Sequence, residues 1–443
     1  MAVRCAVCVC VSVCVALLLV VGGVCEPQDP PAVASPSYGE RGSELGLQVF
    51  RQVLQGAPQG NALLSPHGVA SVLGMLLPGA HGNTRNQLLN SLRYKRNGPY
   101  KMLRKLHKAL TGRANADVVV IANGLFSQHG FAIKPDFLSA NRENFLSESQ
   151  ALDFSQPQEA ATAINDWVNN RTRGHIPTLV SAEMLDPSLT RLVVVNSIFF
   201  KGLWKSRFLP QNTRPRPFTH PDGTTSKVPM MSQLAVFNIG LMSTPEGLKY
   251  KVIELPYHGD SLSMLIALPA EEGTPLAAIL PHISTATVQS WTNQLAQRKI
   301  RLLLPKFTVE AEVDLEAPLR AMGISDMFNE ARADFRHLSE EPVYVSKALQ
   351  KAKIEVNEDG TKAAAATTAI LLARSSPPWV SVDRPFLFLL RHNPTGTHSH
   401  THTHTHNPTG THTHSHMYSD TQPHGYTHTH SHAHIYTHIH MYS

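Results

Sequence analysis

A single arginine follows a run of small residues near the C-terminal end of the chain, and two serines come directly after it. The segment reads GTKAAAATTAILLARSSPPW from Gly360, and between Gly360 and Arg374 only Lys362 is charged. Trypsin-like proteases cleave after such a residue, because the acidic floor of their specificity pocket pairs with a guanidinium. The Arg374–Ser375 bond is therefore a candidate reactive bond.

The residues before Arg374 have the composition of a β-strand. The stretch 361–373 contains β-branched residues but no proline and no aromatic residue. Every second residue from Thr361 to Ala369 is small, so one face of such a strand could slide against a packed interior. Composition alone leaves a flexible Ala/Thr linker open as the alternative.

The chain lacks the motifs of common enzymes. It contains no G-x-S-x-G, H-E-x-x-H or P-loop sequence, and its five cysteines all lie within the first 25 residues. We therefore expect that the protein is not an enzyme, that it has no metal site and no cofactor, and that its reactive bond meets the active site of another protein.

A second candidate site is a cationic helix face. Between Ser91 and Ala116 there are eight Lys or Arg residues and no acidic residue, against a net charge of +6 for the whole chain. The cations recur at i, i+3, i+4 and i+7, with leucines on the opposite face. The stripe consists of Lys101, Arg104, Lys105 and Lys108. It predicts a polyanion site, with a merely solvated helix face as the alternative.

The N-terminal 25 residues are typical of a secretory signal peptide. Arg4 precedes an apolar run, and small residues precede Cys25. Removal of this segment predicts a secreted, extracellular protein without disulfides, which must be stabilised by its core. The run is also about long enough to cross a bilayer, which leaves an uncleaved anchor as an alternative. Residues 26–42, rich in Pro, Ser and Gly, would form a loose segment before a helix capped by Ser43.

The body of the chain carries several motifs in a characteristic order. These are NALLSPHGVASVLGMLLPGA from residue 61, NSIFFKGLWKSRF from residue 196, and ADFRHLS from residue 333. Together with VNEDGTKAAAATTA from residue 356, they resemble the serpin family over residues 43–396. The resemblance implies a mixed α/β serpin fold with three β-sheets, about nine helices and an exposed reactive-centre loop at about 358–380.

The resemblance also implies roles for individual residues. Trp204 would lie at the top of the main sheet where the loop enters, and Asn196 and Ser65 would form the shutter beneath it. Two residues depart from the family pattern: Gly68 stands where a second serine is usual, and Gln350 where many serpins have histidine. The loop hinge would comprise Glu358, Gly360, Thr361, Ala363, Ala364, Ala365 and Ala366. Gly360 and the four alanines are easy to bury, which is typical of inhibitory members.

The activity that the resemblance implies is suicide inhibition of trypsin-like serine proteases, including thrombin, plasminogen activators and plasmin. The cationic stripe resembles the heparin-binding helix of some serpins, so heparin or heparan sulphate would act as an activator. We expect a monomer that binds no nucleic acid and does not insert into membranes. Asn170, in Asn-Arg-Thr, is a candidate glycosylation site. A non-inhibitory glycan-binding or carrier serpin is the alternative.

The C-terminal 47 residues, 397–443, do not fit the family. They hold 15 of the 25 histidines, mostly alternating with threonine, and they stand where a serpin has its last buried strand. A CA-dinucleotide repeat encodes such a sequence, which suggests translated non-coding DNA; metal capture by a disordered segment is the functional alternative. We expect a disordered tail, and a misfolded, nonfunctional isoform if the core below Pro385–Leu390 is uncovered.

Overall fold

The computed structural model describes residues 38–56, 61–93, 100–112, 115, 118–360, 376–394 and 397–404. The predicted signal peptide at 1–25 lies outside these residues, as does most of the segment 26–42. The described part of that segment is not loose: helix α2 (Tyr38–Gly56) begins at Tyr38 and continues through Ser43. The prediction that Ser43 caps this helix is wrong, because five helical residues precede it.

A mixed five-stranded sheet contains the apolar runs that the sequence places in buried strands. Its order is β10-β11-β4-β2-β3, and its central β11–β4 pair is parallel, with antiparallel pairs on either side. All nine residues of β4 are buried, as its continuous apolar sequence predicts. The strands are β2 (Val119–Gln128), β3 (Glu148–Leu152), β4 (Leu192–Phe200), β10 (Phe307–Asp314) and β11 (Val345–Val356).

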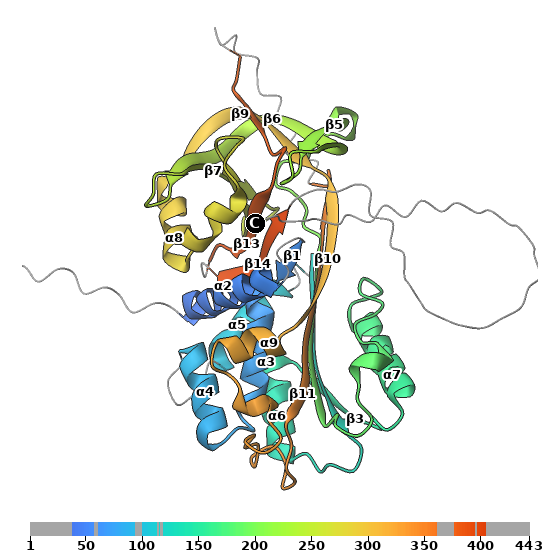
Figure 1. Cartoon of the computed structure of the whole chain (residues 1–443). Helices are drawn as coiled ribbons and strands as arrows, with labels where there is room; N and C mark the ends of the chain where they lie inside the picture. Colours follow the sequence, from blue (N-terminus) through green and yellow to red (C-terminus); the bar gives the residue numbers. More distant parts are fainter. Residues whose placement is uncertain are drawn as a thin grey trace, which may run out of the picture. The chain divides into compact units, whose positions relative to one another are not determined.

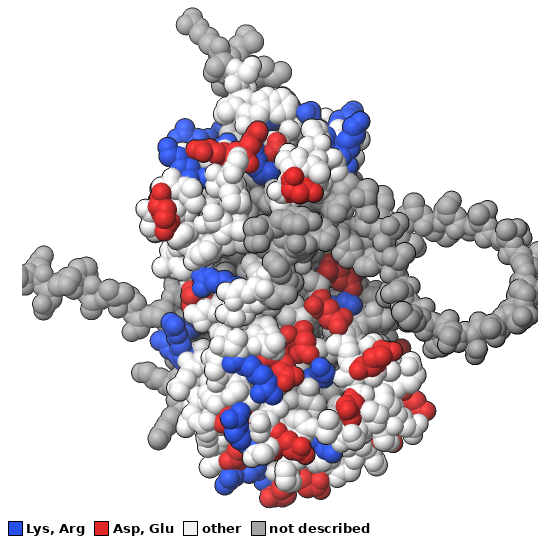
Figure 2. Space-filling model, viewed as in Figure 1, with Lys and Arg blue, Asp and Glu red and all other residues white. Residues whose placement is uncertain are grey.

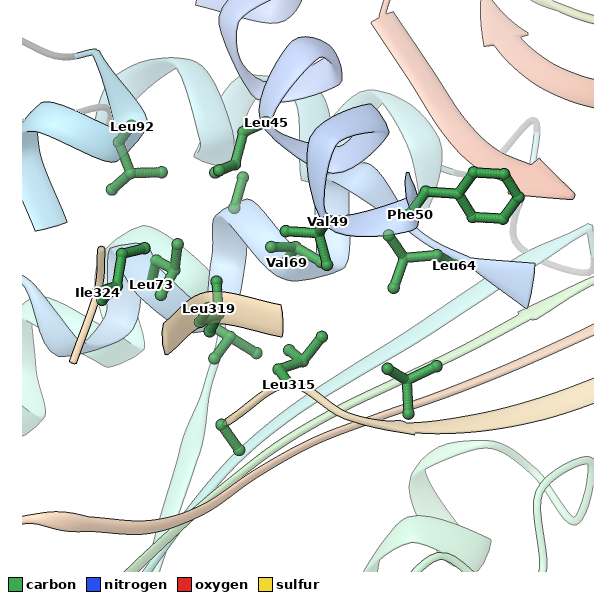
Figure 3. Close-up of a cluster of buried hydrophobic side chains, with 14 of the residues drawn as sticks. Leu45, Val49, Phe50, Leu64, Val69, Leu73, Leu92, Leu315, Leu319 and Ile324 are labelled. Carbon is green, nitrogen blue, oxygen red and sulfur yellow. The ribbon is translucent and has the colours of Figure 1, made fainter. Parts of the chain in front are cut away.

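Helices cover both faces of this sheet (Figure 1). One face carries α7, whereas α3, α5, α6 and α9 lie on the other face. Figure 3 shows the apolar core on the second face, where Val49 of α2 and Val69 of α3 point toward Leu315 and Leu319. The helices are α3 (Pro66–Leu76), α4 (Gly82–Leu92), α5 (Tyr100–Leu110), α6 (Pro135–Phe145), α7 (Pro157–Arg171), α8 (Thr285–Gln294) and α9 (Glu316–Ala321).

The remaining strands form one nine-stranded sheet, so hydrogen bonds join the three expected sheets into two among the described residues. The long strand β6 makes this connection, because it pairs successively with β5, β9 and β7. The order is β1-β14-β13-β8-β7-β6-β9-β12, with β5 on β6. The strands are β1 (Ala62–Leu64), β5 (Arg214–Thr219), β6 (Thr225–Ser243), β7 (Lys249–Pro256), β8 (Leu262–Pro269), β9 (Ala296–Pro305), β12 (Trp379–Ser381), β13 (Phe386–His392) and β14 (Thr397–His404).

Strand β14 corrects the expected C-terminal boundary. Residues 397–404 were predicted to begin a disordered tail, yet they pair with β13 on one side and with β1 on the other. Phe386, Phe388 and Leu390 are fully buried, so the expected exposed core below 385–390 is not found. Alternate residues of this stretch are β-branched threonine or the small serine, a composition that a strand accepts. Residues 405–443 lie outside the described residues.

Candidate functional site: the two ends of the reactive segment

The described chain leaves the five-stranded sheet beside Trp204. The indole Nε1 of Trp204 donates a hydrogen bond to Asn357 O at 2.8 Å, and its backbone N donates to Asp359 O at 3.0 Å. Trp204 and Gly360 also form a parallel β-bridge. A Cβ at Gly360 would lie 2.7 Å from Trp204 O, so only glycine permits this close approach. Trp204 therefore lies beside the chain where it leaves β11; its contact with an inserting loop stays a prediction.

The ring of Trp204 is held by a stacked tyrosine. It is 2% exposed and lies parallel to the Tyr257 ring, with a centroid distance of 4.4 Å. Burial raises the pKa of the Tyr257 phenol well above its ordinary value. A Cβ at Gly202 would lie 2.4 Å from the Tyr257 ring, so the packing of this ring requires glycine at position 202. The stacking of Tyr257 on Trp204 was not predicted, because nothing in the sequence distinguishes Tyr257 from other aromatic residues that follow an apolar strand.

Glu358, the first predicted hinge residue, is fixed by two polar partners. Its Oε1 accepts a hydrogen bond from Thr213 Oγ1 at 2.8 Å, and Lys306 Nζ lies 2.9 Å from its Oε2. Burial alone would raise the pKa of Glu358, but the hydrogen bonds from Lys306 and Thr213 outweigh it and lower the pKa. The carboxylate is thus kept ionised, and it anchors the chain two residues before Gly360.

The predicted shutter residues meet in one buried network below the β4–β11 pair. Gln350 Nε2 donates to Asn196 Oδ1 and to Ser65 O, both at 3.1 Å, while Gln350 Oε1 accepts from Ser65 N at 2.7 Å. Asn196 Nδ2 donates in turn to Asn123 Oδ1 at 2.8 Å. Asn123 is a member that the sequence did not indicate, since it lies inside an apolar strand.

Ser65 also caps the helix that carries it. Its hydroxyl accepts a hydrogen bond from Gly68 N at 3.1 Å, and Pro66 occupies the first helical position, as the Ser-Pro sequence predicts. A Cβ at Gly68 would lie 2.0 Å from Asn196 Oδ1 and 2.2 Å from Gln350 Nε2. The two departures from the family pattern, at 68 and 350, are thus in direct contact, and the glycine provides the space that the glutamine amide fills.

Helix α5 separates its charges from its apolar residues as predicted. Lys101, Arg104, Lys105 and Lys108 are all exposed, whereas Leu103, Leu106 and Leu110 are buried. His107 lies on the buried side at 6% exposure, and desolvation lowers its pKa to about 4. The helix therefore presents a continuous cationic face to solvent.

The far end of the reactive segment is fixed in the other sheet. Pro378 O accepts a hydrogen bond from Arg301 N at 2.9 Å, and Trp379 begins β12, which pairs in parallel with β9. The bond Arg374–Ser375 lies outside the described residues, as do the hinge residues Thr361, Ala363, Ala364, Ala365 and Ala366. Asn170 is exposed in the last turn of α7; its glycosylation stays a prediction.

The described residues hold neither a membrane-spanning helix nor a cluster of metal ligands. None of the helices in the described ranges combines the length and the apolar character that crossing a membrane requires. Among these same residues, His, Cys, Asp and Glu side chains do not gather in groups of three or more that could hold a metal ion.

Known proteins are similar to this chain over most of its length. Residues 40–400 match the family model "Serpin (serine protease inhibitor)". Glia-derived nexin of Rattus norvegicus is 53% identical over 82% of this chain and 91% of its own, and plasminogen activator inhibitor 1 of Neovison vison is 42% identical over 82% and 93%. The crystal structure of native protease nexin-1 with heparin gives a TM-score of 0.78 at 48% identity, covering 83% and 98%. The chain belongs to the serpin family of serine protease inhibitors, and it is not expected to act as an enzyme.

Proposed function

We propose that the protein is a suicide inhibitor of trypsin-like serine proteases, cleaved at Arg374–Ser375. The observation that carries the proposal is the placement of the two ends of the reactive segment. Gly360 follows the end of β11, which lies in the parallel β11–β4 pair, whereas Ser376–Trp379 leads into β12, which pairs with β9 in the other sheet. Cleavage between these anchors frees a segment that remains attached only to β11.

Insertion of this segment between β11 and β4 is favoured by strand direction. A strand that folds back from β11 is antiparallel to β11, and it is antiparallel to β4 as well, because β11 and β4 are parallel. The insertion replaces one parallel pair by two antiparallel pairs, which have the slightly more stable hydrogen-bond geometry. The free energy released would come from this completion of the sheet.

The chemistry of the proposed reaction uses the protease's own serine. Its hydroxyl oxygen attacks the carbonyl carbon of Arg374, the peptide bond to Ser375 breaks, and Ser375 leaves with a free amino group. The ester that remains holds the protease. Fourteen residues, Gly360 to Ala373, would carry it about 46 Å at ~3.3 Å per residue.

The proposed partners are the proteases that would cleave the reactive bond and a glycan that would bind the cations of α5. The targets proposed are thrombin, plasminogen activators and plasmin. The name of the similar plasminogen activator inhibitor 1 supports the plasminogen activators among them. The exposed cations of α5 support heparin or heparan sulphate as an activator, and the similar protease nexin-1 structure contains heparin. The N-terminal sequence supports secretion to the extracellular space, and we propose a monomer that needs no cofactor.

The test is replacement of Arg374 by Ala. Incubation of Arg374→Ala with thrombin or plasmin should give no SDS-stable complex on a gel, because the specificity pocket loses its guanidinium, while retention on heparin should be unchanged. Lys362→Ala, which removes the other cation of the segment, is the matched control and should still form the complex. Heparin retention by a wild-type chain that never traps a protease would instead favour the carrier alternative.

A further inference from the structure

One edge of β6 is open at the end of this strand. Strand β9 pairs with β6 only as far as Ile239, opposite Ala296, whereas β7 follows the other edge of β6 as far as Ser243. Residues 240–243 therefore have a strand neighbour on one side only. An unpaired strand edge carries backbone N–H and C=O groups that can pair with another chain.

Leu241 and Ser243 direct their backbone N–H and C=O groups to the open side. This follows from the turn after β6, in which Thr244 N donates a hydrogen bond to Leu248 O at 2.9 Å. From that pair onward, hydrogen-bonded and non-hydrogen-bonded pairs alternate along the antiparallel ladder, so the groups of residues 241 and 243 point away from β7. None of the described residues forms a hydrogen bond with them on that side.

A hollow of about 540 Å³ lies along this open edge. One wall consists of residues 241–245, and the opposite wall is one face of α8, whose lining residues recur at helical spacing. These residues are Thr287, Ser290, Trp291 and Gln294. The volume lies in the range of binding sites in proteins. The hollow is thus a groove between a strand edge and a helix.

The line of β9 leads into this groove. A Cβ at Gly240 would lie 3.3 Å from Gln294 O, so the end of α8 passes close to β6 just before β9 begins. Beyond Gly240, an added strand would continue the line of β9 and lie beside residues 241–245. Five extended residues span about 17 Å. Pro245, which has no N–H group, ends the edge.

The outer face beside the groove is cationic and partly apolar. Leu241 is 59% exposed, and in the β6–β7 register Lys251 stands opposite Leu241 and Lys249 opposite Ser243. Figure 2 shows Lys and Arg side chains at the end of the molecule where Figure 1 places β6, β7 and β9, with acidic side chains among them. Whether the lysines can receive a partner therefore depends on what the neighbouring carboxylates contact.

The carboxylates of β7 and of the turn before it are engaged elsewhere. Glu246 Oε2 lies 3.1 Å from His282 Nε2, and Glu254 accepts a hydrogen bond from Asn238 Nδ2 at 2.8 Å. Lys249 and Lys251 are therefore available to acidic side chains from outside the chain.

We propose that the β6 edge, defined as residues 241–245 with Lys249 and Lys251 beside them, docks an extended acidic segment of a partner protein, which adds to the sheet as a further strand. Hydrogen bonds to the backbone of Leu241 and Ser243 supply affinity, and the two lysines select acidic side chains. A sulphated glycan would use the lysines but not the backbone groups, so the open edge favours a peptide. The inference does not depend on the proposed function.

The experiment uses the full-length protein and a fluorescein-labelled hexapeptide of alternating glutamate and valine. Fluorescence anisotropy measures binding, and hydrogen exchange is followed at the amides of Leu241 and Ser243. Exchange at these two amides should slow about tenfold or more when the peptide is bound, because they gain hydrogen bonds. A peptide of the same sequence, methylated at its backbone nitrogens, keeps its charges but loses its donors, and it should bind about tenfold more weakly.

Four variants locate the contact. Ser243→Pro removes an outward N–H without breaking the β6–β7 ladder, and it should bind the peptide about tenfold more weakly than its matched control, Ser243→Ala. Lys249→Glu/Lys251→Glu should bind about ten- to a hundredfold more weakly, and the difference should shrink at high salt. Lys105→Glu/Lys108→Glu makes the same change of charge on α5 and should bind as the wild type does.

Equal affinities for the two peptides, or unchanged exchange at Leu241 and Ser243, would overturn the β6 edge as a docking site. Loss of binding in the α5 variant alone would also overturn it, because the cationic stripe would then hold the peptide. Both readouts on the wild type decide the question even if Ser243→Pro does not fold. Trapping of protease should be the same in Ser243→Ala and the wild type, since the β6 edge and the reactive segment are separate.

Discussion

Gly68 and Gln350 both depart from the family pattern, and the buried polar network accommodates them because the two departures compensate each other. The amide of Gln350 occupies the volume that a side chain at 68 would need, and it satisfies both Ser65 and Asn196. Either departure alone would leave a clash or an unpaired polar group, both of which are costly in a buried site.

Gly68→Ala should therefore destabilise the protein by about 1–3 kcal/mol, the usual range for an overpacked core. In a Gln350→Ala background the same substitution should cost less, because the amide nitrogen at 2.2 Å, one of the three nearest atoms that the new Cβ meets, is gone. Melting temperatures of the four proteins in this double-mutant cycle test the coupling. Strictly additive shifts would show that the two positions are independent.

His107 makes α5 sensitive to acid. Its pKa is about 4 in the folded chain, against an ordinary value of 6.5, so between these values the unfolded chain binds more protons than the folded one. Stability is therefore lost as pH falls from about 6.5 toward about 4, and at pH 5 the loss is ~2 kcal/mol.

His107→Gln should remove this contribution. Denaturant midpoints measured from pH 7.5 to pH 4.5 should fall less steeply in the variant than in the wild type, with the two curves parallel above pH 7. Curves that remain parallel throughout the range would mean that His107 is protonated equally in both states.

At the scale of elements, α5 is the clearest case of a structure that its sequence specifies. Leucines and cations alternate with helical period, so burial of Leu103, Leu106 and Leu110 leaves all four cations of the stripe in solvent. Because these cations are exposed, heparin binding should depend strongly on salt concentration.

Replacement of the four stripe cations, Lys101, Arg104, Lys105 and Lys108, by Ala should abolish most of the salt dependence of heparin binding. With four contacts, wild-type affinity should fall about a hundredfold between ~50 and ~200 mM salt, by analogy with counterion release from DNA. Heparin titrations at several salt concentrations measure the slope. The matched control removes four other cations, Arg216, Lys227, Lys299 and Arg301; a slope that flattens equally there would show that charge alone, and not α5, binds the glycan.

Sequence reasoning succeeded where a local pattern decides the structure. The continuous apolar run of β4, the Ser65-Pro66 helix start and the α5 stripe are each readable within about ten residues. It failed where contacts between segments distant in the sequence determine the structure. Lys306 and Thr213 hold Glu358 from other elements, and no local signal marks them. Strand β14 was missed because a Thr/His repeat has no apolar face, and only the unpaired edge of β13 gives it a place.

At the scale of the whole molecule, β14 predicts different effects of two truncations. Ending the chain after His404 removes only residues outside the described fold and should leave the melting temperature unchanged. Ending it after Gly396 removes β14, which leaves β1 without its strand partner and opens one edge of β13. The second loss should be comparable with the whole folding stability of ~5–15 kcal/mol.

Secretion yield and melting temperature of the two truncated chains are the measurements, with the full-length protein as the reference. Equal yields and equal melting temperatures would show that β14 contributes nothing to the fold. The comparison also tells whether residues 405–443 have any structural part of their own.

The place of β14 also has a consequence for the order of events during biosynthesis. Strand β1 leaves the ribosome early, but its partner in the sheet is about 340 residues further along the chain. At about 5–20 residues per second, β1 waits roughly 17–70 s for that partner. During this time β13, once made, also has an open edge. The nascent protein therefore cannot finish its larger sheet until residues 397–404 have been made, and chaperones that shield strand edges would be needed most during that interval.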